Sequence, residues 1–371
     1  MVAADVHTIP FLDLAPSHAP LKGGLLDEMS SLIDSGAFTN GPQVGELESA
    51  LARYCQTREC VGVANGLDAL RLSLVALGVG AGDEVIVPAL TFVASFEAVS
   101  QAGARPVPVD IGDEDYCIAS AAVARAATGA TSAVMPVHLY GQLADMRALE
   151  ELRLPLLEDA CQAHGAERDG VAPGGLAVAA AFSFYPGKNL GAMGDAGAVV
   201  TNDIELADRI RALREHGQTA KYRHEYDGYT SRLDTLQALV LARKLPFLDG
   251  WNEQRRAVAA QYLAALDGVG DLRLPAVAPG SRHVWHLFVL RTADPVALGE
   301  FLRARGIATG RHYPEPPHLS TAWRHLGYGA GDFPVAEAVA RECLSLPMYP
   351  GLTEAQAATV AAAVRAFFDG D

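Results

Sequence analysis

The chain has 371 residues, a length at which one hydrophobic core usually gives way to two, so we expect a large domain with a smaller one. Hydrophobic residues make up 50% of the chain and charged residues 20%, which is typical of a folded globular protein. The 29 basic and 44 acidic residues give a formal net charge of −15, which argues against nonspecific nucleic-acid binding. An anionic small ligand stays compatible with this charge, because the amides of a helix N-terminus can hold a phosphate.

The five cysteines form no CxxC pair and no Cys/His spacing suited to zinc, so we expect no metal site and a reducing, cytoplasmic setting. The first 14 residues, MVAADVHTIPFLDL, contain no basic region followed by an apolar run. No stretch approaches 18 consecutive apolar residues. The sequence therefore predicts neither export nor membrane insertion.

Short β-rich apolar runs alternate with segments of helical periodicity through the first two thirds of the chain, a pattern typical of a mainly parallel sheet covered by helices. The predicted strands are Cys60–Ala64, Glu84–Pro88, Arg105–Val109, Ala133–Val137, Leu154–Leu157, Ala180–Phe184 and Gly197–Thr201. The predicted helices between them are Leu67–Leu77, Val93–Ala102, Ala119–Ala127 and Met146–Leu152. A further helix is expected to be capped by Asn202 or Asp203 and ended by Gly217.

The pattern changes in the last third. Long helices are predicted from Arg232 to about Leu266 with a break near Pro246, because proline interrupts a helix. After them we predict the strand Arg282–Arg291 and the helices Pro295–Arg305, Val335–Leu344 and Thr353–Phe368. The expected architecture is α/β: a large, mainly parallel sheet domain with helices on both faces over residues 1–245, and a smaller C-terminal α+β domain over residues 246–371.

One lysine stands among glycines directly after a predicted strand. In FSFYPGKNLGAMGDAG, residues 182–197, the amine of Lys188 can lie inside the fold beside closely approaching backbone and form a Schiff base with a carbonyl. A loop lysine that pairs with Asp195 explains this segment alone about as well.

An acidic pair ends the strand predicted in LLEDACQAHGA, residues 156–166. Glu158 and Asp159 therefore lie at the C-terminal edge of the sheet, where open α/β sheets bind ligands. Asp159 is the better candidate for a buried carboxylate with a cationic partner. It is equally a candidate for the N-cap of a following helix.

A strand-to-helix turn in ANGLDALRL, residues 64–72, can present the backbone N–H groups of Gly66 and Leu67 to a phosphate. Taken alone, such a turn is more often structural. No GxGxxG follows a predicted strand and no GxxxxGK[ST] occurs, which argues against nicotinamide oxidoreductases and P-loop proteins.

These segments supply, in chain order, a phosphate seat, a strand-edge acid and a lysine, the three parts that a pyridoxal phosphate enzyme requires. On these motifs the chain resembles the sugar aminotransferases of the DegT/DnrJ/EryC1/StrS family, from about Pro10 to past Pro350. The resemblance implies fold type I, pyridoxal 5'-phosphate (PLP) and its pyridoxamine form (PMP) as cofactor, and a homodimer with shared active sites.

The resemblance also implies roles for individual residues at the cofactor ring. Lys188 matches the lysine that binds the cofactor covalently and moves the proton during catalysis. Asp159 and Gln162 match the residues that meet the pyridine nitrogen and the phenolic oxygen. Phe92 matches the aromatic side chain that stacks on the ring, although a core residue at the head of a helix is its plain alternative.

The phosphate contacts implied by the family are the backbone amides of Gly66 and Leu67 and the hydroxyl of Ser183. One departure concerns the partner subunit's cofactor: family members commonly read GxNxR, whereas this chain reads GYTSR, with Thr230 at the asparagine position. A threonine hydroxyl donates to a phosphate over a shorter reach or through water. The residues that match the sugar-substrate site are Tyr185, His312 and Tyr313.

The loop from residue 216 to residue 232 concentrates cations in an acidic chain. Its cations, Arg232 among them, are candidates for neutralising the diphosphate of a nucleotide sugar. A solvated surface loop is the alternative, favoured for Lys221 and Arg223. This loop and the segment Phe38–Pro42 are the parts that the resemblance implies come from the partner subunit.

The resemblance implies a ping-pong transamination, in which an amino acid, expected to be L-glutamate, gives up its nitrogen and a nucleotide-linked keto-deoxysugar accepts it. The motifs NGLDAL, SFYPGKNLGA and LPFLDGWNEQRR look most like members that aminate C3 of a dTDP-3-keto-6-deoxyhexose in antibiotic deoxysugar biosynthesis. C4 amination and a non-catalytic homologue that binds a ligand or partner stay open as alternatives. Lys188 weighs against the family's dehydratases, in which histidine replaces this lysine.

Overall fold

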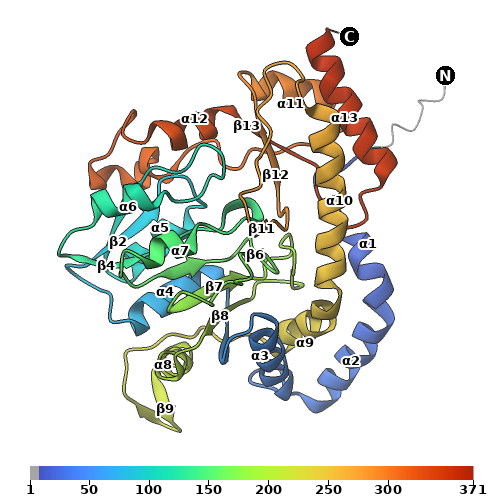
Figure 1. Ribbon diagram of the computed structural model, residues 1–371. Coiled ribbons are helices and arrows are strands. Elements are labelled where there is room, and N and C mark those ends of the chain that lie inside the picture. The colour runs from blue at the N-terminus through green and yellow to red at the C-terminus, as the bar shows by residue number, and fades with distance from the viewer. Residues whose placement is uncertain (1–7, 371) are drawn as a thin grey trace.

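The computed structural model describes residues 8–370 (Figure 1). Residues 1–7, which belong to the N-terminal segment from which no export is predicted and to the predicted large domain, lie outside the described residues, as does Asp371. The strands of the central sheet are β1 Glu59–Val63, β2 Glu84–Pro88, β3 Arg105–Val109, β4 Thr131–Val134, β5 Leu157–Asp159, β7 Ala179–Ser183 and β8 Gly197–Thr201.

These strands lie in the order β3-β2-β4-β5-β7-β8-β1. Parallel bridges at Val134–Leu156 and Val137–Asp159 join the β4 and β5 edges. Strand β8 runs antiparallel to both β7 and β1, while the other neighbouring pairs are parallel. The predicted mainly parallel sheet is confirmed, and the seven predicted strands are all present with ends shifted by at most three residues.

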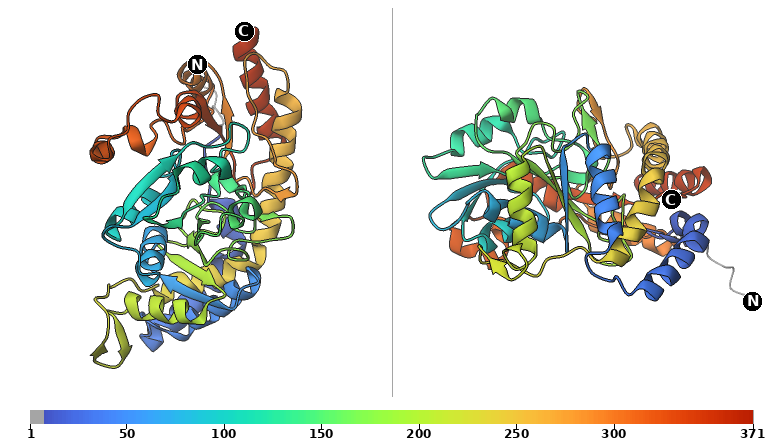
Figure 2. Two further views of the ribbon diagram at one scale, coloured as in Figure 1. Left: turned by 60° about the vertical axis from the view of Figure 1, so that its left-hand side comes forward. Right: turned by 90° about the horizontal axis from the view of Figure 1, so that it is seen from below.

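Helices cover both faces of this sheet, as predicted (Figure 2). The helices on one face are α4 Gly66–Ala76, α5 Ala94–Gln101 and α8 Ile204–Arg214. The helices on the other face are α3 Pro42–Tyr54, α6 Ser120–Ala126, α7 Met146–Glu150 and α9 Thr235–Lys244. Successive strand residues point to opposite faces, so Val61 and Val63 pack toward α4 while Cys60 packs toward α3.

The C-terminal part begins at the predicted break. A 3₁₀ turn at Leu245–Phe247, which contains Pro246, separates α9 from α10 Leu248–Leu266. Its other elements are β11 Ser281–Arg282, β12 Phe288–Arg291, α11 Pro295–Ala304, the 3₁₀ turns Pro317–Leu319 and Thr321–Leu326, α12 Pro334–Glu342, β13 Cys343–Leu346 and α13 Glu354–Asp369. β12 and β13 pair antiparallel, and α13 lies along α10 (Figure 1). Thr353 caps α13 through a reciprocal capping box with Gln356.

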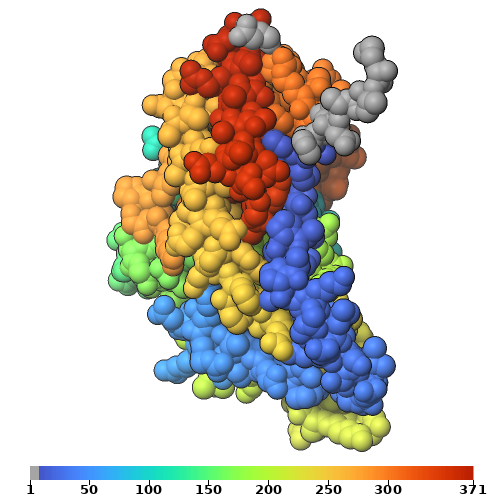
Figure 3. Space-filling view, turned by 90° about the vertical axis from the view of Figure 1, so that its right-hand side faces the viewer, coloured from blue at the N-terminus to red at the C-terminus, as the bar shows by residue number. Residues whose placement is uncertain are grey.

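The remaining elements are peripheral. They are α1 Ala15–His18, α2 Lys22–Ser35, β6 Glu167–Arg168, the hairpin of β9 Gln218–Ala220 and β10 Arg223–His224, and the 3₁₀ turns Ala19–Leu21 and Leu139–Gly141. Figure 3 shows the N-terminal helices beside the C-terminal helices on one face of the molecule. Ile9 forms a parallel bridge with Ile307 and belongs to the C-terminal core. The division at residue 245 stays a prediction.

Further boundaries differ from the sequence-based expectation. The predicted strand Arg282–Arg291 is wrong in its middle, because Trp285 has φ 47° and breaks the extended backbone between β11 and β12. The helix predicted to Leu344 ends at Glu342, and β13 follows at once. Helix α8, capped by Asp203 as predicted, ends at Arg214 rather than at Gly217, whose N–H still donates to the Ala212 carbonyl at 2.8 Å. Within residues 8–370, no helix is long and apolar enough to cross a membrane.

Candidate functional site

A cavity of about 710 Å³ opens at the carboxyl ends of the sheet strands, between the sheet and the C-terminal part. It is lined by residues that follow β1, β2, β5 and β7, which is where parallel sheets bind ligands. The predicted site residues that line it are Gly66, Leu67, Phe92, Asp159, Gln162, Ser183, Tyr185, Lys188, His312 and Tyr313. The chain thus brings together ten predicted residues from segments far apart in the sequence.

Lys188 lies in a tight loop after β7. Its backbone N–H donates to the Tyr185 carbonyl at 2.8 Å, and a Cβ at Gly191 would stand 2.3 Å from the Pro186 carbonyl oxygen, so the loop closes only with glycine there. Burial lowers the pKa of Lys188, and the neighbouring Cys161 and Asp159 oppose that shift. Within residues 8–370, Lys188 makes no ion pair with Asp195. This argues against the alternative interpretation, a loop lysine that pairs with Asp195.

Asp159 ends β5 and is 6% exposed. Its Oδ2 accepts a hydrogen bond from the Ser95 hydroxyl at 2.8 Å, and its Oδ1 accepts from the Cys161 N–H at 3.2 Å. The residues after Asp159 form turns and not a helix, so the N-cap alternative is wrong. The carboxylate is instead held in place at the floor of the cavity.

Gln162 and Tyr313 approach each other across the cavity from the two parts of the chain. The Gln162 Oε1 accepts from the Tyr140 N–H at 2.7 Å, which turns its Nε2 toward the cavity. This Nε2 donates to the Tyr313 hydroxyl at 3.1 Å. Because Nε2 carries two hydrogens, Gln162 can donate a second hydrogen bond to an oxygen in the cavity.

The N-terminus of α4 faces the cavity. Asn65 caps this helix by accepting from the Asp68 N–H at 2.8 Å, and the first intrahelical bond runs from the Ala69 N–H to the Asn65 carbonyl. The amides of Gly66 and Leu67 therefore lack intrahelical partners and suit an anion. The Ser183 hydroxyl, which accepts from the Tyr185 N–H at 3.4 Å, can donate its hydrogen beside them.

Phe92 is half exposed, at 50%, although it is a large apolar side chain. Its ring lies 5.6 Å from the Tyr313 ring and lines the cavity, so the interpretation as a plain core residue is wrong. An exposed aromatic face in the same cavity as a buried carboxylate is a surface on which a planar ring can stack.

The outer part of the cavity carries further aromatic groups. Tyr185 is 59% exposed, and the His312 ring stacks on Phe11 at 5.4 Å. Burial and, secondarily, Lys188 lower the pKa of His312 to about 4, so this imidazole is neutral at pH 7. Neutral polar groups with aromatic neighbours suit an uncharged polar ligand such as a sugar ring.

Thr230 and Arg232 lie outside this cavity. The Thr230 Oγ1 lies 3.3 Å from His216 Nε2 on an exposed segment, and Arg232 pairs with Glu215 at 2.8 Å. Arg223 pairs with Glu225 on the hairpin. The contacts predicted for Thr230 and Arg232 are not made in this cavity and stay predictions.

Sequence reasoning missed several residues at the site. Thr91 and Ser95 form a buried chain of hydroxyls that ends on Asp159, with 2.8 Å between their oxygens. His286 lines the cavity beside Leu287, in the predicted strand that Trp285 interrupts. A helix start rich in hydroxyls could have indicated Ser95, whereas no signal in the predicted strand distinguishes His286.

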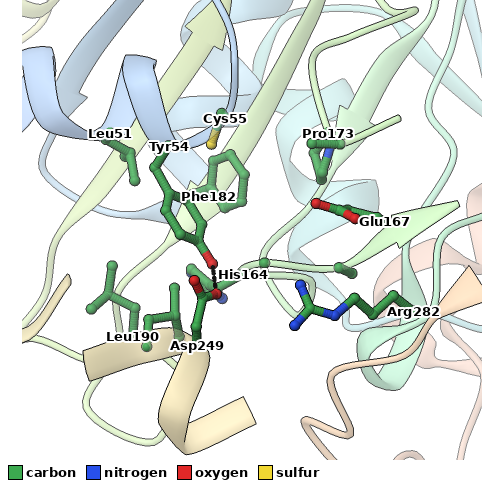
Figure 4. A pocket seen from close by; sticks show the side chains of 14 residues that line it. Leu51, Tyr54, Cys55, His164, Glu167, Pro173, Phe182, Leu190, Asp249 and Arg282 are labelled. Carbon is green, nitrogen blue, oxygen red and sulfur yellow. Dashed lines mark hydrogen bonds between the residues drawn. The ribbon is translucent and has the colours of Figure 1, made fainter. Parts of the chain in front are cut away.

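A second cavity of about 240 Å³ lies on the opposite side of β7 (Figure 4). Phe182 lines it, while the adjacent Ser183 lines the larger one, as the alternation of a strand requires. His164 faces this second cavity with its ring 5.3 Å from Phe182, and Tyr54 donates to Asp249 Oδ1 at 2.7 Å at its edge. None of the predicted site residues lines it.

The larger cavity fits a pyridoxal phosphate. A Cβ at Gly66 would stand 2.5 Å from the Ser183 Cβ and 2.9 Å from the Cys161 Sγ. Because residue 66 is glycine, the N-terminus of α4 can lie directly against the end of β7, the strand that precedes Lys188. A carboxylate, an amide donor, an aromatic face and an amine converge on the same space. This set of groups on a mainly parallel α/β sheet defines a fold type I enzyme that uses PLP.

The chain belongs to the DegT/DnrJ/EryC1/StrS aminotransferase family, whose model matches residues 22–365. It is 48% identical over 366 residues to a dTDP-3-amino-3,4,6-trideoxy-alpha-D-glucose transaminase from Streptomyces venezuelae, which covers 98% of this chain and 97% of that protein. The crystal structure of S. venezuelae DesV in complex with a ketimine intermediate superposes with a TM-score of 0.96 at 48% identity, covering 98% of this chain and 99% of that one.

The structure of ntda from Bacillus subtilis with bound PMP superposes with a TM-score of 0.91 at 29% identity, covering 100% of this chain and 87% of that one. The chain is thus an aminotransferase of this family and depends on PLP. The predictions of family, fold type and cofactor are confirmed.

Proposed function

We propose that the protein transfers the amino group of L-glutamate to C3 of a dTDP-linked 3-keto-6-deoxysugar in deoxyaminosugar biosynthesis. The observation that carries this proposal is the convergence of Lys188, Asp159 and the α4 N-terminus on one cavity. The sugar and its C3 position are supported by the printed activity of the Streptomyces relative at 48% identity.

In this proposal the α4 amides of Gly66 and Leu67 and the Ser183 hydroxyl hold the cofactor phosphate. Phe92 stacks on the ring, Asp159 meets the ring nitrogen and Gln162 meets the phenolic oxygen. When bound, PLP supplies an electron sink for the carbanion that forms on the substrate carbon next to nitrogen. A carboxylate at Asp159 favours a protonated ring nitrogen, which is the state that accepts those electrons best.

In this proposal Lys188 moves the proton between the substrate carbon and the cofactor. Its Nζ has to be neutral to take a proton from the substrate carbon, and burial lowers its pKa in that direction. The loop closed by Gly191 fixes the backbone of Lys188, so that only the side chain has to move to bring the amine to the reacting carbons. Within each half-reaction, Nζ would take a proton from one carbon and return it to another: from the donor's α-carbon to the cofactor's C4′ in the first, and from C4′ to the sugar carbon in the second.

We also propose that the enzyme is a homodimer with shared sites. Thr230 and the loop of residues 216–232 do not line the cavity of their own chain, so we infer that their predicted contacts with phosphate groups are made in a partner's site. Large apolar or aromatic side chains are exposed on α2, on the loop after it and around the hairpin: Leu26, Ile33, Phe38, Tyr222 and Tyr226. Burying such side chains between two subunits is favourable.

Half-reaction spectroscopy tests the proposed function. Addition of L-glutamate to the PLP form is expected to convert the cofactor absorbance to that of PMP, and a dTDP-linked 3-keto-6-deoxysugar is expected to restore it. Conversion by glutamate without restoration by any nucleotide-linked keto sugar would refute the proposed acceptor. Absence of any change on adding either substrate would support a non-catalytic homologue instead. A sedimentation measurement of the purified protein tests the dimer, which a monomeric mass would contradict.

A further inference from the structure

A directional chain of hydrogen bonds ends on His286 in the cavity. The Asn252 Nδ2 donates to the His164 carbonyl at 2.9 Å. The Asn189 Nδ2 donates both to the Asn252 Oδ1 and to the Val284 carbonyl, each at 2.9 Å. The Asn189 Oδ1 then lies 3.1 Å from the His286 Nδ1.

Two backbone carbonyls fix the direction of this chain. A carbonyl can only accept, so the amide nitrogens of Asn252 and Asn189 must face the carbonyls of His164 and Val284. The oxygen of Asn189 must therefore face His286, and the His286 Nδ1 has to carry a hydrogen. The hydrogen bond from Nδ1 to Asn189 thus determines the tautomer of this imidazole. Such partners commonly set the tautomer of functional histidines.

The same imidazole is uncharged. Burial lowers the pKa of His286 well below its ordinary value, and the charges of Lys188 and Arg255 lower it further. With Nδ1 occupied as a donor to Asn189, the Nε2 of a neutral ring is a lone-pair acceptor with no hydrogen to give. His286 lines the same cavity as Lys188, His312 and Tyr313.

We propose that His286 is a specificity-determining residue for the sugar, whose Nε2 accepts a hydrogen bond from a hydroxyl of the sugar ring. This inference rests on the proposed function and assigns His286 to the half-reaction with the sugar.

The two substrates differ in what they offer to such an acceptor. A deoxysugar carries hydroxyl donors next to its reacting carbon. An amino acid carries carboxylates, which are acceptors only and are repelled by a lone pair, and its amino group is the reacting group that lies at Lys188. A neutral hydrogen-bond acceptor therefore strengthens binding of the sugar and contributes little to binding of the amino donor. A buried acceptor left without its donor costs free energy, so a ligand without the hydroxyl is rejected.

The test compares His286→Phe with His283→Phe as a matched control. His283 is a buried imidazole three residues away whose ring stacks on Trp285 at 4.0 Å and whose Nδ1 accepts from the Trp285 N–H, and it does not line the cavity. A second variant, His286→Gln, keeps an acceptor oxygen in case the phenylalanine variant does not fold. For each variant we measure the rate and affinity of the glutamate half-reaction, and kcat and KM for the dTDP-linked keto sugar.

His286→Phe is expected to raise KM for the sugar at least about 10-fold, as loss of one buried hydrogen bond does, and to change the glutamate half-reaction by less than about 2-fold. His286→Gln is expected to lie between wild type and His286→Phe, and His283→Phe to keep the wild-type KM. Equal losses in both half-reactions, or an unchanged sugar KM, would overturn the inference. If wild type itself accepts no nucleotide-linked sugar, the proposed function fails first and this inference with it.

Discussion

The hydroxyl of Ser95 donates to the Oδ2 of Asp159 at 2.8 Å, although the two residues are 64 positions apart in the sequence. Ser95 receives in turn a hydrogen bond from Thr91, and all three side chains are buried. Helix α5 thus positions the carboxylate that is proposed to meet the cofactor ring nitrogen. Because a charged acceptor in a buried setting depends on each of its donors, this contact affects catalysis as well as folding.

The variant Ser95→Ala is expected to lower kcat about 10-fold, since a hydrogen bond to a charged group contributes roughly 1.5–3 kcal/mol. The matched control is Ser73→Ala, which removes another fully buried hydroxyl, one that donates to the Ala69 carbonyl within α4. Ser95→Ala is expected to lose more stability in urea denaturation than Ser73→Ala, because only Ser95 donates to a charged group. Equal kcat values for the two variants would show that Ser95 has only a structural role.

Replacement of Lys188 is the direct test of the amine. Lys188→Ala is expected to fold and to bind PLP through the remaining contacts, but to lose at least about 10³-fold in kcat, because the covalent anchor and the proton carrier are removed together. Borohydride treatment of the wild-type holoenzyme is expected to fix the cofactor on the peptide that contains Lys188. Label on another lysine, or full turnover by the alanine variant, would contradict the assignment.

The close approach of Gly66 to Ser183 predicts that a larger residue at position 66 weakens the binding of PLP. An alanine Cβ there would meet Ser183 and Cys161 at 2.5 and 2.9 Å, so the α4 N-terminus must move away from Ser183. Gly66→Ala is expected to weaken PLP binding about 10-fold, as loss of one good phosphate contact does. Gly250→Ala is the control, because nothing lies within 4 Å of a Cβ at that position in α10. A titration with PLP that gives equal affinities for the two variants would contradict the phosphate seat.

Lys244 predicts a pH dependence of stability. Its ammonium is buried, it donates to the Gly191 carbonyl and lies 3.0 Å from the His18 Nε2, and burial lowers its pKa to about 8. Between pH 8 and the ordinary lysine pKa, the unfolded chain holds a proton that the folded chain has released. Raising the pH across this window therefore stabilises the folded state, by at most about 1.4 kcal/mol per pH unit.

Urea denaturation of wild type and Lys244→Met at pH 7, 8, 9 and 10 measures this effect. The difference in unfolding free energy between the two proteins is expected to move in favour of wild type as the pH rises from 8 to 10, because methionine does not titrate. A difference that is constant with pH would show that the pKa of Lys244 is not lowered by folding.

Much of the site was predictable because its residues belong to short local motifs. Asp159 ends an apolar strand, Gly66 and Lys188 follow such strands, and a parallel sheet brings these strand ends to one edge. The structure adds what local patterns do not contain: Asp159 has no helix to cap, and Lys188 has no ion pair with Asp195 within the described part of the chain.

His286 could not be predicted because its position depends on a break at Trp285, where a left-handed backbone replaces the regular alternation of the expected strand. Its partner Asn189 follows Lys188 directly, yet the amide is fixed by α10 and by Val284, which are remote in sequence. Thr230 and Arg232 stay predictions for a different reason, since their proposed partners belong to a second subunit.

The central claim, amination at C3 of a nucleotide-linked sugar, is tested most directly by the product. The purified PLP enzyme is incubated with L-glutamate and, in separate reactions, with a 3-keto and a 4-keto dTDP-6-deoxysugar, and the position of the new amine is read by NMR. We predict an amine on C3 from the 3-keto substrate, with loss of the product when Lys188 is replaced by alanine. An amine formed on C4, or no aminated sugar from the 3-keto substrate, would contradict the account.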